Sequence, residues 1–522
     1  MDSIRIRRAL ISVSDKAGIS DLGRALAGHG VEIISTGGTL AALKKEDIQA
    51  LSVSTFTGAP EILGGRVKTL HPKVHAGILF RRDSEADMAE MTHQECKAID
   101  MVVVNLYPFE KVVADHQSTE QEIIENIDIG GPSMIRAAAK NFSGVVVVTD
   151  PADYSGIIEE LDKNDGAIGM ELRKRLAIKA FGLSSRYDRA IFEYFQHGRR
   201  KEGERFPSEL SVSYNLQSGL RYGENPHQEA AFYSEAGFGG PSLVGARILS
   251  GKELSFNNIG DLDATLEMLL DFEEPFACVL KHANPCGAAV GRTLAEAYER
   301  ALASDPLSAF GSIIGLNKPV DMETARLVHE THFVECILAP GYDEDVFELM
   351  KKKKARRILA LPGILKGRPK GEMVFKFVRG GLLCQTADEV LQGESDLKVV
   401  TKRKPTNGEL QSLLFAWKVV KHTKSNAIVL VKDGATVGIG MGQTSRVDAS
   451  ALAVKRAGDR ARGAVLASDA FFPMPDGVEV ATEAGVTAFI QPGGSKGDQQ
   501  AIEAADRAGA AMVFTGIRHF KH

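Results

Sequence analysis

The adjacent residues Lys281 and His282 are the clearest candidates for proton-transfer chemistry. They follow directly after the apolar run Phe276–Leu280 and precede the turn-forming segment Asn284–Gly287. Histidine can act as a general base near neutral pH because its unperturbed pKa is about 6.5. A neighbouring lysine can stabilise negative charge on a reacting oxygen or donate a proton. The pair therefore predicts a catalytic base at a strand end, with a purely structural histidine as the alternative.

A second set of polar groups lies within the first 140 residues. Lys68 stands in a loop with Arg66 and His71, Tyr107 follows the apolar run Met101–Val104, and Asp128 begins a turn that leads into a helix carrying Lys140. Two ammonium groups, a phenol and a carboxylate at one rim would suit proton transfers around an oxyanion. The alternative is that these polar groups lie at the surface by chance and have no catalytic role.

Two turns of small residues, Ser12–Lys16 and Ser35–Thr39, follow the first two apolar runs of the chain. Small residues let backbone N–H groups approach a phosphate, and the helix that follows adds partial positive charge. Lys16 and the hydroxyls of Ser14 and Thr39 could complete a monophosphate cradle. Neither GxGxxG nor GxxxxGK[ST] occurs in these turns, which argues against a dinucleotide or a triphosphate.

The elements that must position these groups follow from the apolar runs. In the first 200 residues, short apolar runs alternate with segments of helical spacing, for example Ala9–Val13, then Ile19–Gly28, then Val31–Ile34. Strands that are apolar on both faces and separated by helices indicate a parallel sheet covered on both sides. In such a sheet, ligands bind at the carboxyl ends of the strands.

The length of 522 residues indicates several domains. The charged segment 196–207 is predicted to link a domain of residues 1–200 to one of residues 201–522. In the second part, the runs Phe276–Leu280 and Ala427–Val431 are each followed by a Gly-containing turn and a helix-like segment. We therefore expect two related α/β subdomains, approximately 208–395 and 396–522.

The composition narrows the classes of function. The net charge of -5 gives no global attraction to nucleic acid or to an anionic membrane. The five scattered cysteines form no CxxC pair, which is typical of reduced thiols in a cytoplasmic protein. No apolar run approaches the roughly 20 residues that span a bilayer. Since no CxxC or HxE accompanies Pro285-Cys286, we also expect no zinc site.

Many long segments carry a family resemblance. The first part contains SVSDK, STGGT, GGRVKTLHPKVHAGIL, NLYPF and IDIGGPSMIRAAAKN. The second part contains LRYGENPHQ, GKELSFNN, LKHANPCGAAVG, DPLSAFGSI, FAWKVVKHTKSNAI, GIGMGQTSRVDA, DAFFPMPDG and QPGGS. Together, and in this order, they resemble the bifunctional purine biosynthesis enzymes that combine AICAR transformylase and IMP cyclohydrolase.

The resemblance implies a fold and two reactions. It implies a doubly wound, methylglyoxal synthase-like N-terminal domain for the cyclohydrolase and duplicated, cytidine deaminase-like α/β subdomains for the transformylase. A formyl group would pass from 10-formyltetrahydrofolate, as cosubstrate, to AICAR, and the product FAICAR would close to IMP with loss of water. The resemblance further implies a cytoplasmic homodimer without a catalytic metal, and it allows a structural monovalent cation.

The resemblance also assigns roles to residues. Catalytic roles fall to Lys281, His282, Lys68, Tyr107, Asp128 and Lys140. Substrate contacts in the first part fall to Ser14, Lys16, Thr36, Gly37, Gly38, Thr39, Arg66, Thr69 and Asn105. Those in the second part fall to Arg221, Tyr222, His227, Gly311, Glu335, Asn426, Arg446, Phe471, Ser495 and Arg518. Glu335 stands where some members carry Asp, and the Lys-Gly after QPGGS departs from the usual apolar-Arg pair.

Three other functions are consistent with parts of the sequence. A nucleotide-binding regulatory module would explain the N-terminal fold, but not the Lys-Tyr-Asp-Lys set. A deaminase-like enzyme would explain the second part, although the zinc ligands of that class are missing. A phosphosugar lyase would use the first domain alone and would leave most of the chain unexplained.

Overall fold

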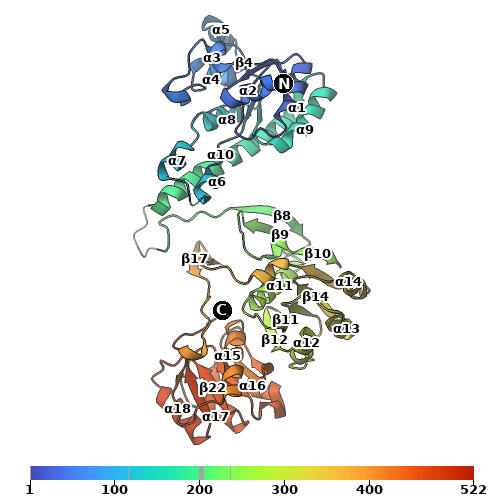
Figure 1. The fold of residues 1–522 in the computed structure, drawn as a ribbon, viewed down its shortest axis with the longest axis vertical. Coiled ribbons are helices and arrows are strands. Elements are labelled where there is room, and N and C mark those ends of the chain that lie inside the picture. The colour runs from blue at the N-terminus through green and yellow to red at the C-terminus, as the bar shows by residue number, and fades with distance from the viewer. Residues whose placement is uncertain (1, 116, 199–204, 236) are drawn as a thin grey trace. The chain divides into compact units, whose positions relative to one another are not determined.

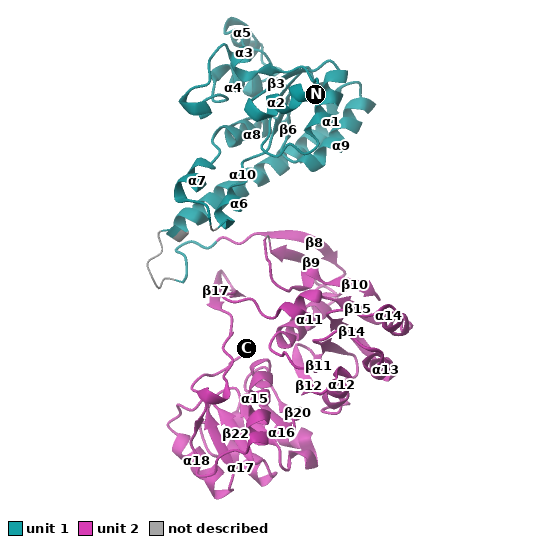
Figure 2. Cartoon of the chain, in the orientation of Figure 1, with its two compact units in different colours: residues 1–210 teal, residues 211–522 magenta. Residues whose placement is uncertain are grey.

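The computed structural model describes residues 2–115, 117–198, 205–235 and 237–522. The chain forms two compact units, residues 1–210 and residues 211–522, which Figure 2 colours separately. Residues 199–204 of the predicted linker 196–207 lie outside the described residues.

Unit 1 is built on a five-stranded parallel sheet in the order β4-β3-β2-β5-β6 (Figure 1). The strands are β2 (Arg8–Ser12), β3 (Glu32–Ser35), β4 (Leu51–Ser52), β5 (Met101–Val104) and β6 (Val146–Val148). The aliphatic side chains of β2, β3, β5 and β6 are buried on both faces because helices cover both sides of the sheet.

The strand order of unit 1 reverses next to β2. From β2 the chain builds β3 and β4 on one side, then returns to place β5 and β6 on the other side. This is the doubly wound arrangement that the alternating apolar runs predict, and that prediction is confirmed. The crevice at the carboxyl ends of β2, β3 and β5 is the place where such sheets bind ligands.

The helices of unit 1 connect these strands, and a small antiparallel pair, β1 (Ser3–Arg5) with β7 (Ala167–Gly169), lies apart from the main sheet. The helices are α1 (Ile19–Gly28), α2 (Gly37–Lys45), α3 (Val53–Thr57), α4 (Pro72–Leu79), α5 (Glu85–His93), α6 (Phe109–Ala114), α7 (Glu120–Glu125), α8 (Gly130–Lys140), α9 (Tyr154–Lys163) and α10 (Met170–Gly198). Helix α2 begins two residues after β3, inside the predicted phosphate turn.

Unit 2 contains a twelve-stranded sheet whose two halves repeat each other. The order is β10-β15-β14-β13-β11-β12-β20-β19-β21-β22-β23-β18, so that β12 and β20 meet at the centre and each half then runs outward through corresponding pairings. The first half comprises β10 (Arg247–Ser250), β11 (Phe276–Lys281), β12 (Asn284–Val290), β13 (Ser312–Leu316), β14 (Val334–Ala339) and β15 (Arg357–Ala360). The second comprises β18 (Lys398–Val399), β19 (Ile428–Lys432), β20 (Ala435–Gly440), β21 (Val465–Ser468), β22 (Ala488–Gln491) and β23 (Ala511–Phe514). The predicted duplication is therefore confirmed.

The helices of unit 2 repeat in the same way. The first half, here called the first lobe, has α11 (Phe256–Leu269), α12 (Leu294–Leu302), α13 (Met322–Glu330) and α14 (Glu344–Met350), and the second lobe has α15 (Asn407–Lys421), α16 (Arg446–Ala457), α17 (Asp476–Glu483) and α18 (Asp498–Arg507). One core, which includes Leu266 of α11 and Trp417 of α15, spans both lobes on a shared face of the sheet. Two hairpins stand outside it, β8 (Tyr214–Leu220) with β9 (Ala230–Glu235) and β16 (Met373–Val378) with β17 (Gly381–Thr386).

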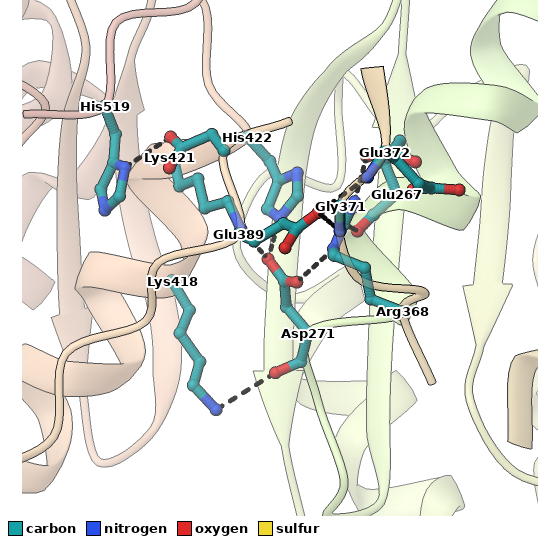
Figure 3. Close-up of polar contacts among 11 residues, drawn as sticks. Glu267, Asp271, Arg368, Gly371, Glu372, Glu389, Lys418, Lys421, His422 and His519 are labelled. Carbon is teal, nitrogen blue, oxygen red and sulfur yellow. Dashed lines mark hydrogen bonds and ion pairs between the residues drawn. The ribbon is translucent and has the colours of Figure 1, made fainter. Parts of the chain in front are cut away.

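A buried ionic cluster joins the end of α11 in the first lobe to the end of α15 in the second lobe (Figure 3). The Asp271 carboxylate, which follows α11, accepts hydrogen bonds from Lys421 Nζ at 2.8 Å and from His422 Nε2 at 2.7 Å, both at the end of α15. It also accepts one from Arg368 Nε at 3.1 Å. Burial favours the neutral acid, but these partners hold the pKa of Asp271 well below its usual range. The cluster thus fixes α11 to α15 through a charged group that is almost wholly buried.

Among the described residues, no helix combines the length and the apolar character needed to cross a membrane. Across the same residues, no group of three or more His, Cys, Asp or Glu side chains is arranged to hold a metal ion.

Candidate functional sites

The carboxyl ends of β2, β3 and β5 open onto a cavity of about 650 Å³ in unit 1. The residues that the sequence places in a cyclohydrolase-like site line this cavity, with Lys140 as the exception: Ser14, Lys16, Thr36, Gly37, Gly38, Thr39, Arg66, Lys68, Thr69, Asn105, Tyr107 and Asp128. They come from five different loops and helix starts, and the strand order brings together those that follow β2, β3 and β5.

The two small-residue turns are tied to each other by their hydroxyl groups. Ser12 Oγ and Thr36 Oγ1 lie 2.6 Å apart. Thr39 Oγ1 donates to the Val13 carbonyl at 2.9 Å and accepts from the Val13 N–H at 3.0 Å. Because Thr39 is buried and both of these bonds are internal, its hydroxyl shapes the turn and does not supply a free phosphate donor.

Asn105 shapes the β2–α1 loop in the same manner. Its amide oxygen accepts from the N–H groups of Ser14 at 2.6 Å and Asp15 at 3.0 Å, and its amide nitrogen donates to the Asp15 carbonyl at 2.9 Å. The predicted substrate contact is therefore also a support of the loop that carries Ser14 and Lys16.

Two helix N-termini point positive partial charge at the cavity. Helices α2 and α8 begin there with Gly37 and Gly130, and neither N-cap residue closes its helix with a side-chain hydrogen bond. Lys16 extends over the start of α2, since a Cβ atom built on Gly38 would lie 3.7 Å from Lys16 Nζ. Two helix N-termini and an ammonium group at one edge of a cavity suit the binding of a phosphate monoester.

Asp128 and Lys68 are neighbouring titratable groups of the cavity. Burial raises the pKa of the Asp128 carboxyl, and the Gly131 N–H, 2.8 Å from Oδ1, and the charge of Lys68 oppose that rise. Glycine is required at position 131 because a Cβ atom there would lie 2.4 Å from Asp128 Oδ2. A half-buried carboxyl of raised pKa beside a lysine is the arrangement of a general acid or base.

Tyr187 of α10 holds the Asp128 loop from behind, and sequence reasoning missed it. Its hydroxyl accepts from the Asp128 N–H at 2.7 Å and donates to the Asn126 carbonyl at 3.1 Å. Burial raises the pKa of Tyr187 to about 12, so this hydroxyl keeps its proton. The available signal was a tyrosine on the packed face of a long helix, because buried tyrosine hydroxyls usually find a partner.

The rim of the cavity carries an exposed ion pair between Arg66 and Glu125 of α7. Arg66 is thus held at the mouth by a carboxylate that the sequence analysis did not select. Tyr107 lies at the same rim with 43% of its surface exposed.

Lys140 does not line the cavity, so its role in ring closure stays a prediction that rests on the resemblance. Lys140 is the exposed last residue of α8, whereas the first residues of that helix line the cavity. At 1.5 Å per residue, eleven residues place it about 15 Å from the helix start. Helical spacing predicts a shared face with Arg136, but it does not predict which end of the helix meets the ligand.

In unit 2, Lys281 and His282 lie where β11 turns into β12. Lys281 Nζ donates to the Phe310 carbonyl at 2.7 Å, and His282 is exposed. Gly311 is the next residue after Phe310 and has a φ of 70°, a conformation that favours glycine. Three predicted site residues therefore come together at the first lobe.

A second group surrounds a buried arginine in the second lobe. The Arg446 guanidinium donates to Asn426 Oδ1 at 2.7 Å and pairs with the fully buried Asp469. The C-terminal tail reaches this group, because the Lys521 N–H donates to Ser425 Oγ at 3.2 Å and the His519 N–H donates to the Asp469 carbonyl at 2.9 Å. The predicted residues Asn426 and Arg446 thus lie together, and Asp469 is the support that the sequence analysis missed.

The remaining predicted residues of unit 2 belong to neither of these two groups. Glu335 is paired with Arg357 at 2.5 Å, and Ser495 Oγ accepts the Gly497 N–H at 3.0 Å. Phe471 is exposed at 37%. Arg221, Tyr222 and His227 share the loop after β8, and Arg518 of the tail lies over the Phe520 ring. The Lys424 N–H donates to Asn284 Oδ1 at 3.2 Å and so joins the second lobe to the turn region of His282.

Comparison with known proteins matches both units. The sequence model of the MGS-like domain matches residues 18–133, and that of the AICARFT/IMPCHase bienzyme matches residues 138–456. The bifunctional purine biosynthesis protein PurH of Thermoanaerobacter sp. is 51% identical over 99% of this chain and 100% of its own length. The protein of the same name from Acetivibrio thermocellus is 49% identical over the same shares of the two chains.

A solved structure, the crystal structure of ForH, is 36% identical over 36% of this chain and 99% of its own, with a TM-score of 0.34, and carries no argument here. The full-length matches decide the family. This chain belongs to the AICARFT/IMPCHase bienzyme family.

Proposed function

We propose that unit 2 transfers a formyl group from 10-formyltetrahydrofolate to AICAR and that unit 1 closes the resulting FAICAR to IMP. The family is that of enzymes with both activities, and the match covers essentially the whole chain. The observation that carries the division between the units is the cavity of unit 1, whose anion site and Asp128–Lys68 pair suit a nucleoside monophosphate and its dehydration.

In the formyl transfer, the 5-amino nitrogen of AICAR attacks the formyl carbon and the bond from that carbon to N10 of the folate breaks. The attacking amine becomes positively charged and must lose a proton. His282 is the proposed base that takes this proton and returns it to N10. Lys281 is held against the Phe310 carbonyl beside Gly311, where its charge can stabilise the oxyanion that forms on the formyl oxygen.

In the ring closure, the carboxamide nitrogen of FAICAR attacks the formamide carbon, and the formyl oxygen leaves as water. The water takes up two protons, one lost by the carboxamide nitrogen and one lost by the formamide nitrogen as the C=N bond forms. Asp128 is the proposed base for the carboxamide proton, and its raised pKa makes it a better base than an exposed aspartate. Lys68 would stabilise the oxyanion, with Tyr107 as a further donor at the rim. Ser14, Lys16 and the start of α2 would bind the phosphate. The proton-transfer role that the resemblance gives to Lys140 stays a prediction, since this residue does not line the cavity.

We also propose that the protein is a homodimer. The β16–β17 hairpin forms an isolated two-stranded sheet, and Phe377 on it is 79% exposed. Such a hairpin is marginally stable by itself, which supports association with a second copy. Light scattering after size exclusion tests this. A cytoplasmic location and a structural monovalent cation rest on the resemblance and remain predictions.

The proposal is tested by assaying the purified chain for each half-reaction. With AICAR and 10-formyltetrahydrofolate we expect IMP and tetrahydrofolate in equal amounts. With FAICAR alone we expect IMP without folate. Formation of FAICAR that never proceeds to IMP would remove the role of unit 1, and closure of FAICAR without any formyl transfer would remove that of unit 2.

A further inference from the structure

The repeat within unit 2 places the same tight turn twice in one molecule. In the first lobe, His282-Ala283 joins β11 to β12, with Lys281 paired to Asn284. In the second lobe, Asp433-Gly434 joins β19 to β20, with Lys432 paired to Ala435. The two hairpins occupy corresponding positions in the sheet order, so one is an internal reference for the other.

The two turns have the same backbone but very different sequences. The φ angles are 53° and 56° at His282 and Ala283, and 53° and 74° at Asp433 and Gly434. A turn with positive φ at both central residues favours Asn-Gly or Asp-Gly. Asp433-Gly434 fits this rule, whereas His282-Ala283 places a Cβ atom at both strained positions. Such a conformation persists only where its surroundings hold it.

A carboxylate from a neighbouring helix holds the His282 turn. Asp261 of α11 accepts a hydrogen bond from the Ala283 N–H at 2.7 Å, and its carboxylate is also hydrogen-bonded by the His282 backbone. On the other side, Asn284 Nδ2 donates to the His282 carbonyl at 3.0 Å. The second turn has an outside contact as well, from Arg300 to the Asp433 carbonyl, but its own residues already suit the conformation.

We propose that Asp261 is a positioning residue for the formyl transfer, because its carboxylate fixes the left-handed His282-Ala283 turn and thereby the direction of the His282 imidazole. The inference rests on the proposed role of His282 as the base. It explains why the lobe that carries the histidine departs from the turn sequence of the other lobe. A relaxed turn would still hold a histidine, but it would point the ring in many directions.

The test is the change Asp261→Ala, with formyl transfer and FAICAR closure both measured on the full chain. Loss of the bonds to the turn should lower kcat for transfer on the order of 10- to 100-fold. The KM for AICAR should change little, since the imidazole acts on the reaction more than on binding. FAICAR closure should keep its rate, which also shows that the variant is folded. Asp433→Ala, at the corresponding turn, is the matched control and should leave transfer unchanged.

Two further variants distinguish positioning from a charge effect. Asp261→Asn keeps an acceptor oxygen and should retain more activity than Asp261→Ala. In the Asp261→Ala background, Ala283→Gly removes one Cβ from the strained turn and should recover part of the lost kcat, which loss of a charge would not allow. Adding Asp261→Ala to His282→Ala should cause no further loss.

The outcomes separate the inference from the function on which it rests. If His282→Ala inactivates transfer but Asp261→Ala keeps full kcat, or if Ala283→Gly restores nothing, the positioning role is wrong. If His282→Ala itself keeps full transfer activity, the proposed base is wrong, and Asp261 then has no catalytic base to position.

Discussion

The two units gather their predicted site residues in different ways. In unit 1, neighbouring parallel strands end at one edge, and the groups after β2, β3 and β5 line a single cavity. In unit 2, some of the predicted residues form one group around Lys281 and others a second group around Arg446, one on each lobe of a duplicated sheet, and the rest belong to neither group. Strand order thus assembles much of the first site, whereas the second depends on how two lobes are held together.

Both units nevertheless support a proposed catalytic group from a neighbouring helix. Tyr187 of α10 holds the backbone of Asp128, and Asp261 of α11 holds the turn of His282. The comparison therefore predicts separate supports for separate activities, and changes in one unit should leave the reaction of the other intact.

The largest expected effect comes from the proposed base itself. His282→Ala should lower formyl transfer by roughly two to four decades, the usual contribution of a general base, and should leave closure of supplied FAICAR unchanged. Product analysis of both half-reactions measures this. His227→Ala changes another histidine of the same unit and serves as the control. This variant should bind substrate more weakly, with a smaller change in kcat. A His282→Ala protein that loses both activities while remaining folded would contradict the division between the units.

The next effect concerns the lobe junction of unit 2. Asp271→Ala leaves Lys421 buried without its carboxylate, and breaking a buried ion pair costs about 3–5 kcal/mol of unfolding free energy. The single tryptophan, Trp417, is buried in unit 2, so its fluorescence in urea reports this unit specifically.

Glu479→Ala provides the matched control for that experiment. It removes an exposed ion pair with Arg507 in the same unit and should cost about 0–1 kcal/mol. Equal stability losses for the two variants would show that the cluster of Figure 3 does not hold the lobes together.

A smaller effect is expected at the support of the unit 1 site. Tyr187→Phe removes the hydroxyl that bonds the Asp128 N–H, and loss of one hydrogen bond should slow FAICAR closure about threefold to tenfold. The change should fall on kcat, and formyl transfer should stay at the wild-type rate. Tyr154→Phe, on α9, serves as the control tyrosine of the same unit. A Tyr187→Phe enzyme with normal closure would show that the Asp128 loop needs no such support.

The smallest effect is a pH dependence of the stability of unit 2. Burial lowers the pKa of His422 to about 4, although the hydrogen bond to Asp271 acts to raise it. The unfolded chain therefore binds a proton below about pH 6.5 that the folded chain does not bind until about pH 4, so stability falls as the pH decreases. From pH 7 to 6 one such histidine accounts for roughly 0.7 kcal/mol. His422→Gln should remove this part of the slope, and an unchanged slope would contradict it.

The fold was largely predictable because its signals are local. The apolar run Met101–Val104 coincides with β5, the run Phe276–Leu280 lies within β11, and the segment Ile19–Gly28 is α1. The site of unit 1 was predictable for a related reason, since residues that follow parallel strands meet at one edge.

The supports of the sites were not predictable from local pattern. The contact of Tyr187 with Asp128 joins residues 59 positions apart, and that of Asp261 with Ala283 spans 22 positions, so each depends on helix packing. The place of Lys140 at the end of α8 that lies away from the cavity was not predictable either, because helical spacing does not indicate which end of a helix meets a cavity. The strain at His282-Ala283 was also hidden, since nothing in the letters indicates that both residues are left-handed.

The most direct test of the two-site account mixes two single variants. His282→Ala should lack formyl transfer, and Lys68→Ala should lack ring closure because the oxyanion loses its cation. Each alone, given AICAR and 10-formyltetrahydrofolate, should form almost no IMP, with FAICAR accumulating only in Lys68→Ala. An equal mixture should form IMP, because FAICAR released by one protein is closed by the other. Failure of the mixture to form IMP, with both variants folded and each unchanged site active in its own assay, would contradict the account.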